Sequence, residues 1–264
     1  MKITFVMGSH PRHYHIAKKI FEAGFLSRIL IETRENMLPI RPSDLSQNIA
    51  ELYDEHFVGR ERAEQRHFGS PTKLQVETKV IEKNELNSTE VIDYINEANT
   101  DLILSYGVHK FTNETLGTLN AKYKWNIHGG LSPWYRGVLT HFWPTYMLEP
   151  QMIGMTIHEL TEAIDGGDVV HQVAAELIRG DGIHDTACRA VLALGEEISK
   201  LLKIVSEGGY RGSMKHKTSG RIWRAIDWRP EHLKQIYTLY DNKIVDRYID
   251  GEFANSKPNL YRQF

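Results

Sequence analysis

Apolar residues at the start of the chain alternate between continuous runs and stretches with helical spacing. Residues 3–7 form a short apolar run of the kind found in buried strands. From Tyr14 to Ala23 the apolar residues recur at intervals of three and four, and Gly24 stands where a helix would end. A second apolar run follows at residues 29–31. This β-α-β order predicts a parallel sheet with a right-handed crossover.

The same alternation continues to about residue 205. Three further apolar runs predict strands, and three longer amphipathic stretches predict helices. The predicted strands are residues 76–81, 102–104 and 124–128, and the predicted helices are residues 49–66, 89–98 and 186–205. The first of these helices ends in a mixed-charge run, which favours a solvated face over a substrate-binding surface. We therefore predict an α/β, Rossmann-like fold, with a mostly parallel twisted sheet flanked by helices.

The stretch between residues 139 and 175 contains both helical spacing and strand patterns. Aromatic and apolar residues from Leu139 to Met147 have helical spacing, which predicts a helix packed on the core and ended by Pro150. Residues 153–160 and 169–175 are predicted strands, with a Gly-Gly pair between them. The intervening loop is therefore expected to join two strands or to cross between neighbouring ones.

After residue 208 the sequence becomes richer in glycine and then in aromatic residues. Gly208, Gly209 and Gly212 predict a flexible join. The aromatic content that follows is too high for a disordered tail, and we predict a helix at residues 230–240 and a strand at 244–249. The chain is thus divided into a main domain, residues 1–208, and a small C-terminal extension, residues 209–264. The extension is expected to act as a lid or as a subunit contact in a homodimer.

The 264 residues have the composition of an ordinary soluble globular protein, 41% apolar and 25% charged. A formal net charge of −2 argues against a nucleic-acid partner. Cys188 is the sole cysteine, so no intrachain disulfide can form, and its apolar neighbours predict a buried side chain. The first residues do not resemble a signal peptide, and no apolar run reaches membrane-spanning length. We expect a cytoplasmic protein with no membrane partner.

Candidate chemistry is concentrated at Asn126, His128 and Asp165. In a strand, residues two apart face the same side, so Asn126 and His128 project together. Asp165 lies on a glycine-rich loop 37 positions beyond His128. Taken singly, Asn126 is more typical of a turn and His128 of a hydrogen-bonded core histidine. Together they offer a donor, a titrating base and an anionic partner.

Three separated motifs surround these residues: Asn126-Ile127-His128, Leu131-Ser132-Pro133-Trp134-Tyr135-Arg136-Gly137 and Asp165-Gly166-Gly167-Asp168. His158 stands seven residues before Asp165. This order and spacing resemble the folate-dependent formyltransferase family, most of all its sugar N-formyltransferases. The resemblance implies an enzyme that uses N10-formyltetrahydrofolate as formyl donor, with Asn126, His128 and Asp165 as catalytic residues.

The resemblance also implies a set of donor-binding residues, in which main-chain groups after the strand at 102–104 bind the pterin ring. That set is Leu104, Ser105, Tyr106, Gly107, Val108, His109, Gly129, Gly130, Leu131, Arg136, Gly137, Glu162, Ala163 and Ile164. Alternative roles are an ordinary turn for Gly107, a surface position without a partner for His109, and a brace for the motif loop for Arg136. No metal is expected, because the thirteen histidines do not fall into zinc-like clusters with carboxylates.

The first loop suggests a substrate contact. Ser9, His10, Arg12 and His13 stand at a helix N-terminus, where backbone N–H groups favour an anion. The two interpretations of this loop are a phosphate contact from the substrate and a solvated polar loop. The loop lacks the Gly-x-Gly-x-x-Gly pattern of dinucleotide-binding proteins.

The expected mechanism is direct attack of an amine on the formyl carbon, through a tetrahedral intermediate. The Asn126 amide would donate to the oxyanion. The Asp165 carboxylate would favour the imidazolium form of His128, and it would collect the amine proton directly or through water.

The acceptor is expected to be the amine of a nucleotide-linked amino sugar. The purine-pathway members of the family carry a different first loop, and the members that act on initiator tRNA have a larger, basic C-terminal domain. The alternatives are a formyltransferase acting on another small amine, similar to glycinamide ribonucleotide, a formyltetrahydrofolate hydrolase, and a non-catalytic folate-binding carrier or regulator.

Overall fold

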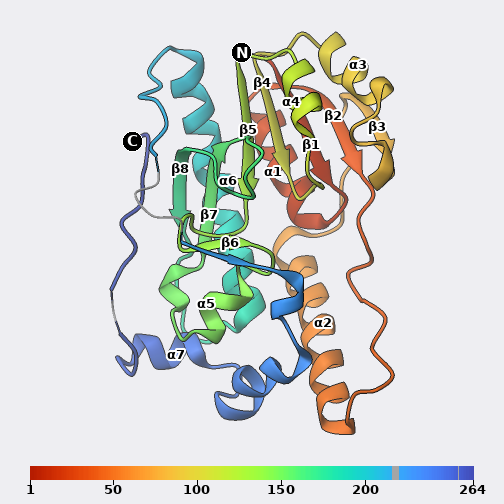
Figure 1. Cartoon of the computed structure of the whole chain (residues 1–264). Coiled ribbons are helices and arrows are strands. Elements are labelled where there is room, and N and C mark those ends of the chain that lie inside the picture. Colours follow the sequence, from red (N-terminus) through yellow and green to blue (C-terminus); the bar gives the residue numbers. More distant parts are fainter. Residues whose placement is uncertain (216–219, 255) are drawn as a thin grey trace.

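A seven-stranded sheet forms the centre of the molecule (Figure 1). The computed structural model describes residues 1–215, 220–254 and 256–264. The strands are β1 (Ile3–Gly8), β2 (Leu26–Glu32), β3 (Glu77–Ile81), β4 (Leu102–Tyr106), β5 (Tyr123–His128), β7 (Gly154–Glu159) and β8 (Val169–Ala174). They lie in the order β3-β2-β1-β4-β5-β7-β8, with β7 antiparallel to both neighbours and all other pairs parallel. The predicted Rossmann-like α/β fold is confirmed.

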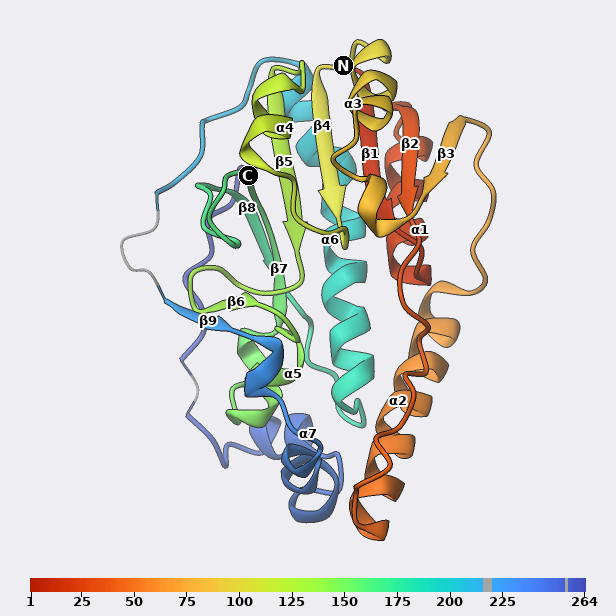
Figure 2. The ribbon, with the colours of Figure 1, turned by 45° about the vertical axis from the view of Figure 1, so that its right-hand side comes forward.

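Helices cover both faces of this sheet. α1 (Pro11–Glu22) and α6 (Ile183–Ser206) pack on one face, and α3 (Thr89–Glu97) and α4 (Asn113–Thr118) lie on the other (Figure 2). The long α2 (Gln47–Phe68) follows β2 and contacts both α1 and α6. Within the described ranges, no helix combines the length and the apolar character needed to cross a membrane.

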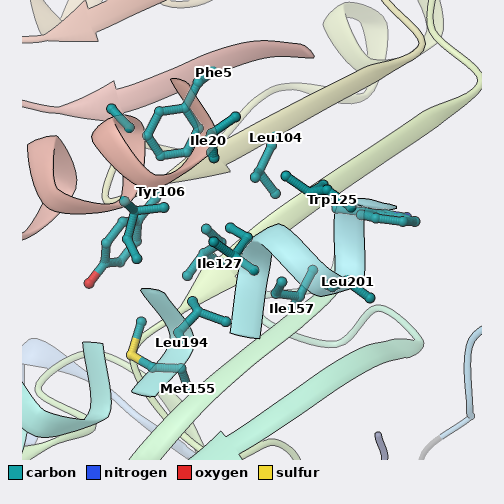
Figure 3. Close-up of a cluster of buried hydrophobic side chains, with 14 of the residues drawn as sticks. Phe5, Ile20, Leu104, Tyr106, Trp125, Ile127, Met155, Ile157, Leu194 and Leu201 are labelled. Atoms are coloured by element: carbon teal, nitrogen blue, oxygen red, sulfur yellow. The ribbon is translucent and has the colours of Figure 1, made fainter. Parts of the chain in front are cut away.

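The core follows from the alternation of side chains along the strands. Phe5 and Leu104 face α1 and α6, whereas Val6 and Ile103, one position away, face α3. All four are at most 1% exposed. Figure 3 shows the cluster on the first face, to which α6 contributes Leu201. Helices cover both faces of the central strands, so side chains on both faces are buried. The sequences of these strands are therefore continuous apolar runs, as the sequence pattern indicated.

The C-terminal residues are folded against the main domain. β9 (Arg221–Trp223) pairs in parallel with β6 (Tyr135–Gly137), a three-residue strand outside the main sheet. α7 (Ile244–Ile249) shares a hydrophobic cluster with α2 and α5 (Phe142–Tyr146), below the sheet in Figure 1. The shorter helical turns of the molecule are Lys83–Glu85, Pro150–Met152, Ala225–Asp227, Pro230–His232 and Lys234–Leu239. The domain boundary at residue 208 stays a prediction.

The predicted helix from Leu139 to Met147 is shorter than expected. Leu139 has a backbone φ of 55°, in the left-handed region, so the helix begins only at Phe142. Leu139 and Met147 are 40% and 48% exposed, and the buried part of the predicted stripe is Phe142 and Trp143.

The prediction of a strand at residues 244–249 is wrong, because this segment is α7. Ile244, Val245, Tyr248 and Ile249 occupy positions i, i+1, i+4 and i+5, a spacing that places them on one side of a helix. The segment was too short for its composition alone to distinguish the two structures.

Replacement of Leu201 by alanine is expected to destabilise the protein. Leu201 is fully buried under the sheet, and its truncation should lower the free energy of unfolding by about 2–5 kcal/mol. Denaturant unfolding of Leu201→Ala measures this change. The exposed Lys203 on the same helix provides the control, and Lys203→Ala should shift the free energy by less than about 0.5 kcal/mol. Equal effects of the two substitutions would contradict the assigned core.

Candidate active site

Three polar residues predicted from separated motifs lie together at the carboxyl end of β5. His128, the last residue of β5, places Nδ1 3.3 Å from Oδ2 of Asp165 in the β7–β8 loop. Asn126 lies on the same face of β5, and its Nδ2 is 3.1 Å from Nε2 of His158 on β7. This nitrogen of His158 is 3.5 Å from Oδ1 of Asp165. An amide, two imidazoles and a carboxylate therefore form one cluster at the end of the sheet where α/β proteins place ligands.

The short strand β6 holds both partners of the His128–Asp165 contact. Nε2 of His128 donates to the carbonyl oxygen of Tyr135 at 2.8 Å. The backbone N–H of Gly137 donates to Oδ2 of Asp165, also at 2.8 Å. The imidazole and the carboxylate are thus fixed by two residues of the same strand.

The backbone around Asp165 is also fixed by β6. Asp165 has a φ of 44°, in the left-handed region, which aspartate tolerates better than most residues. Arg136 donates from Nε and Nη2 to the carbonyl oxygen of Ile164, at 3.1 and 2.6 Å.

Gly137 has a φ of 95°, and a Cβ there would lie 2.1 Å from the carbonyl oxygen of Trp223 on β9. Only glycine allows β6 and β9 to approach this closely.

The contacts of His128 favour its protonated form. Burial has the largest effect on the pKa of His128 and lowers it below its usual value, although the Asp165 carboxylate and the Tyr135 carbonyl oppose this shift. Each ring nitrogen faces an oxygen acceptor, so either neutral tautomer would leave a lone pair against an oxygen. Burial also raises the pKa of Asp165, but His128 and the Gly137 N–H oppose it, and that pKa lies well below its usual range. We therefore describe Asp165 as a carboxylate, and the oxygen beside each ring nitrogen favours the imidazolium form of His128 against the effect of burial.

The amide of Asn126 is oriented by its neighbours. Oγ of Ser105 donates to Oδ1 of Asn126 at 2.8 Å. Nδ1 of His158 lies 2.8 Å from the Glu159 carbonyl oxygen and donates to it, so Nε2 accepts from Nδ2 of Asn126. An amide nitrogen carries two hydrogens, and this bond uses one of them.

A cavity of about 550 Å³ adjoins this cluster, with His128 in its wall. Part of the wall comes from α2, which contributes Tyr53, His56, Phe57, Arg60, Glu64 and Phe68. The prediction of a solvated face for the charged run of α2 is therefore wrong at two positions: Arg60 lines the cavity, and Glu64 does so while only 5% exposed. The signal was present in the sequence, because both residues continue the helical spacing of Tyr53 and His56.

Glu64 occupies the position at the N-terminus of α1 where we expected a substrate anion. Its carboxylate accepts from the backbone N–H of Arg12 at 3.4 Å and pairs with the Arg12 guanidinium. His10 uses both ring nitrogens within the protein, Nδ1 with Arg12 Nη2 at 2.9 Å and Nε2 with the Glu35 carbonyl at 2.8 Å. His10 and Arg12 line the cavity, but with their main polar groups already paired.

Ser9 and His13 complete the predicted substrate loop. Oγ of Ser9 accepts the backbone N–H of Arg34 at 2.9 Å, so its side chain supports the adjoining segment. His13 is 1% exposed, and burial lowers its pKa well below the usual value, so the ring is neutral. Its Nε2 lies 2.2 Å from where a Cβ of Gly107 would be, and Gly107 has a φ of 70°. Gly107 is therefore required by both its conformation and its neighbour.

The residues predicted to bind the pterin lie partly in the cavity wall and partly behind it. Tyr106 and Gly107 line the cavity. Leu104 and Ser105 are buried within β4, and Val108 packs against the cluster under α3. The strand β4 is paired with β1 and β5 as far as Tyr106, so the segment beyond the sheet begins at Gly107.

His109 has a partner that the sequence did not reveal. Its backbone N–H donates to Oε2 of Glu32 at 3.1 Å, and its Nδ1 pairs with Oε1. Arg34 Nη1 lies 3.0 Å from Oε1 of Glu32. Glu32 is fully buried at the end of β2, and a buried carboxylate requires such partners. The expectation of an unpartnered surface histidine is wrong.

The other predicted donor-binding residues surround the His128–Asp165 pair. Gly129 and Gly137 line the cavity, whereas Gly130 and Leu131 are buried beside it. Residues 162–164 are exposed and lie directly before Asp165, where a ligand can reach them.

No group of three or more His, Cys, Asp or Glu side chains among the described residues could hold a metal ion. Cys188 is 4% exposed, and burial raises the pKa of its thiol, in agreement with the apolar role predicted for it.

A site of this kind at the carboxyl end of a mostly parallel sheet defines an α/β protein equipped for acyl or proton transfer. Residues 38–198 match the family model described as formyl transferase. Because the match spans more than half of the chain, the protein belongs to the formyl transferase family.

One curated relative is the bifunctional polymyxin resistance protein ArnA of Wigglesworthia glossinidia brevipalpis. It is 30% identical over 112 residues, which is 42% of this chain, and the chain spans only 17% of that relative.

Several solved structures share the fold at identities below 20%. A sugar N-formyltransferase from a Shewanella species has a TM-score of 0.56 at 15% identity, covering 86% of this chain and 78% of that one. The phosphoribosylglycinamide formyltransferase of Anaplasma phagocytophilum also scores 0.56, at 16% identity, covering 79% and 88%. A formyltransferase from Anoxybacillus kamchatkensis, solved with UDP-4,6-dideoxy-4-formamido-L-AltNAc and tetrahydrofolate, scores 0.50 at 17% identity, covering 83% and 96%. These likenesses establish the fold.

Asp165→Asn is expected to destabilise the protein in a pH-dependent manner. The folded-state pKa of Asp165 is depressed, so its stabilising effect is present above the unfolded pKa near 3.9 and is lost as pH falls toward the folded pKa. At pH 7 the variant should lose about 1–3 kcal/mol of unfolding free energy. The difference from wild type should stay constant down to about pH 5 and shrink below about pH 4.

Urea unfolding across this pH range measures the difference. Asp168→Asn, in the same loop, is the matched control, because Asp168 forms no ion pair with a described residue. A pH-independent loss for Asp165→Asn would contradict the ionised Asp165 carboxylate.

Proposed function

We propose that this protein transfers a formyl group from N10-formyltetrahydrofolate to the primary amine of a nucleotide-linked amino sugar. The convergence of Asn126, His128 and Asp165 beside a cavity carries this proposal. Family membership supports formyl transfer, and the sugar N-formyltransferases among the structural relatives support the acceptor class.

The proposed chemistry is a direct transfer between two nitrogens. The acceptor amine attacks the formyl carbon, the carbonyl becomes an oxyanion, and the bond from carbon to the folate nitrogen then breaks. The amine loses a proton and the folate nitrogen gains one. The protein therefore has to stabilise an oxyanion and carry a proton.

The cluster can meet both needs. The second N–H of the Asn126 amide and the protonated ring of His128 face the same side of β5 and would stabilise the oxyanion. The Asp165 carboxylate holds the positive charge of His128 and would accept the amine proton, directly or through one water. His158 is assigned a positioning role, because it contacts both Asn126 and Asp165.

The donor would lie against the segment that begins at Gly107 and against the exposed residues 162–164. Tyr106 and Gly107 line the cavity, and Gly107 brings bare backbone to its wall. The residues present therefore fit a flat ring held by main-chain groups close to Asp165. The acceptor would enter through the part of the cavity formed by α2 and the first loop.

The test is incubation with 10-formyltetrahydrofolate and a panel of amines, namely UDP- and dTDP-linked amino sugars and glycinamide ribonucleotide. Release of tetrahydrofolate should require an amine, and a nucleotide-linked amino sugar should give the fastest release. Preference for glycinamide ribonucleotide would overturn the acceptor assignment. Release without any amine would indicate a hydrolase, and donor binding without turnover would indicate a carrier.

Alanine substitution of Asn126, His128 or Asp165 should each lower kcat by about 10²–10³-fold, because each removes a contact to developing charge. Pre-steady-state assays should show no burst, since no covalent enzyme intermediate is expected. Asp93→Asn, at an exposed position of α3, is the control and should keep the wild-type rate. Wild-type turnover in any of the three alanine variants would refute that residue's role.

A further inference from the structure

Three arginines line the cavity, and two of them are neutralised within the protein. Arg12 pairs with the buried carboxylate of Glu64. Arg34 pairs with Glu32 at 3.0 Å and with Glu35 at 3.2 Å. These contacts leave little unpaired positive charge at the first loop, where the sequence suggested a phosphate site.

Arg60, the third arginine, is held in place by contacts that leave its charge unbalanced. Its Nη2 donates to the carbonyl oxygen of Met37, and its guanidinium carbon lies 4.9 Å from the centre of the Phe57 ring. Its Nε is buried and has no hydrogen-bond partner in the described structure. No carboxylate of the described residues forms an ion pair with Arg60. A buried hydrogen-bond donor without a partner is unfavourable unless a ligand supplies an acceptor.

The surroundings of Arg60 disfavour its positive charge. Burial lowers the pKa of Arg60, and Arg12 lowers it further, against opposing effects of Glu64 and Glu35. Those two glutamates are themselves engaged by Arg12 and Arg34. An entering anion would therefore meet a partly desolvated guanidinium whose attraction water does not screen fully.

We propose that Arg60 is the anion-binding residue of this cavity, and that it takes a phosphate or carboxylate group of a bound ligand. The planar guanidinium suits the oxygens of either group, and such charge-assisted bonds are among the strongest that a side chain forms. The Phe57 and Met37 contacts hold the guanidinium before the ligand arrives, which reduces the entropy lost on binding.

Two ligands of the proposed reaction carry such groups. A nucleotide-linked acceptor has a diphosphate, and the folate donor has glutamate carboxylates. Arg60 lies on α2, in the part of the cavity assigned above to the acceptor, and this favours the acceptor diphosphate. The choice of source rests on the proposed function, whereas the anion subsite itself does not.

The test uses inorganic pyrophosphate as the probe, with binding measured by isothermal titration calorimetry. Wild-type protein should bind pyrophosphate, and Arg60→Gln should weaken binding about tenfold or more. Arg62→Gln, two positions on at an exposed site of the same helix, is the matched control and should bind as wild type does. Arg60→Lys is the conservative variant, because it retains a positive charge and can keep the contact with the Met37 carbonyl.

The subsite is overturned if wild-type protein does not bind pyrophosphate, if Arg60→Gln binds it equally well, or if Arg62→Gln loses as much affinity. Thermal unfolding of all variants verifies that they are folded, and Arg60→Ala, which also removes the charge, replaces Arg60→Gln if that variant does not fold. Because the probe requires no turnover, the result is independent of whether formyl transfer is found.

Titrations with UDP, dTDP and 5-formyltetrahydrofolate identify the source of the anion. Arg60→Gln should weaken the binding of UDP or dTDP and leave that of 5-formyltetrahydrofolate unchanged. The reverse pattern would overturn the diphosphate assignment and place the glutamate carboxylates of the donor at Arg60.

Discussion

The contact between His128 and Asp165 depends on β6, a strand of only three residues. The carbonyl of Tyr135 fixes the imidazole, the N–H of Gly137 fixes the carboxylate, and the side chain of Arg136 fixes the carbonyl before Asp165. Removing β6 would leave the imidazole on β5 and the carboxylate on a distant loop with no common support. The motif Leu131–Gly137 therefore acts as the frame of the site.

The C-terminal residues support this frame. β9 pairs with β6, and the approach of Gly137 to Trp223 leaves no room for a side chain at residue 137. The extension is thus joined by backbone hydrogen bonding to the strand that holds His128 and Asp165. A supporting role of this kind needs neither a lid nor a subunit contact, the two roles expected from the sequence.

Both the fold and the central cluster could be predicted from the sequence, but for different physical reasons. Buried parallel strands are continuous apolar runs in the sequence, so the sheet could be predicted without homologues. The spacing of Asn126 and His128 places both side chains on one face of a strand, whatever the rest of the chain does. That Asp165 reaches them came from the family motifs, because nothing in the local pattern around Asp165 indicates a contact 37 residues away.

The parts that escaped prediction are those decided by long-range packing. The helical spacing of Glu64 indicates an inward-facing side chain, but nothing in its charged run indicates that it fills the N-terminus of α1, 52 residues before it in the chain. The bond between His109 and Glu32 likewise joins two strand ends that only the folded sheet brings together. Residues 244–249 form a helix that buries Ile244 in a cluster with residues distant in the chain, and a six-residue apolar segment alone does not reveal such packing.

The central claim is that one amide, one imidazole and one carboxylate surround a migrating formyl group. A crystal structure with the unreactive donor isomer 5-formyltetrahydrofolate tests it most directly. We expect the pterin against the segment that begins at Gly107, with the N10 atom next to the Asn126, His128 and Asp165 side chains. A donor bound elsewhere, with N10 out of reach of all three side chains, would contradict it.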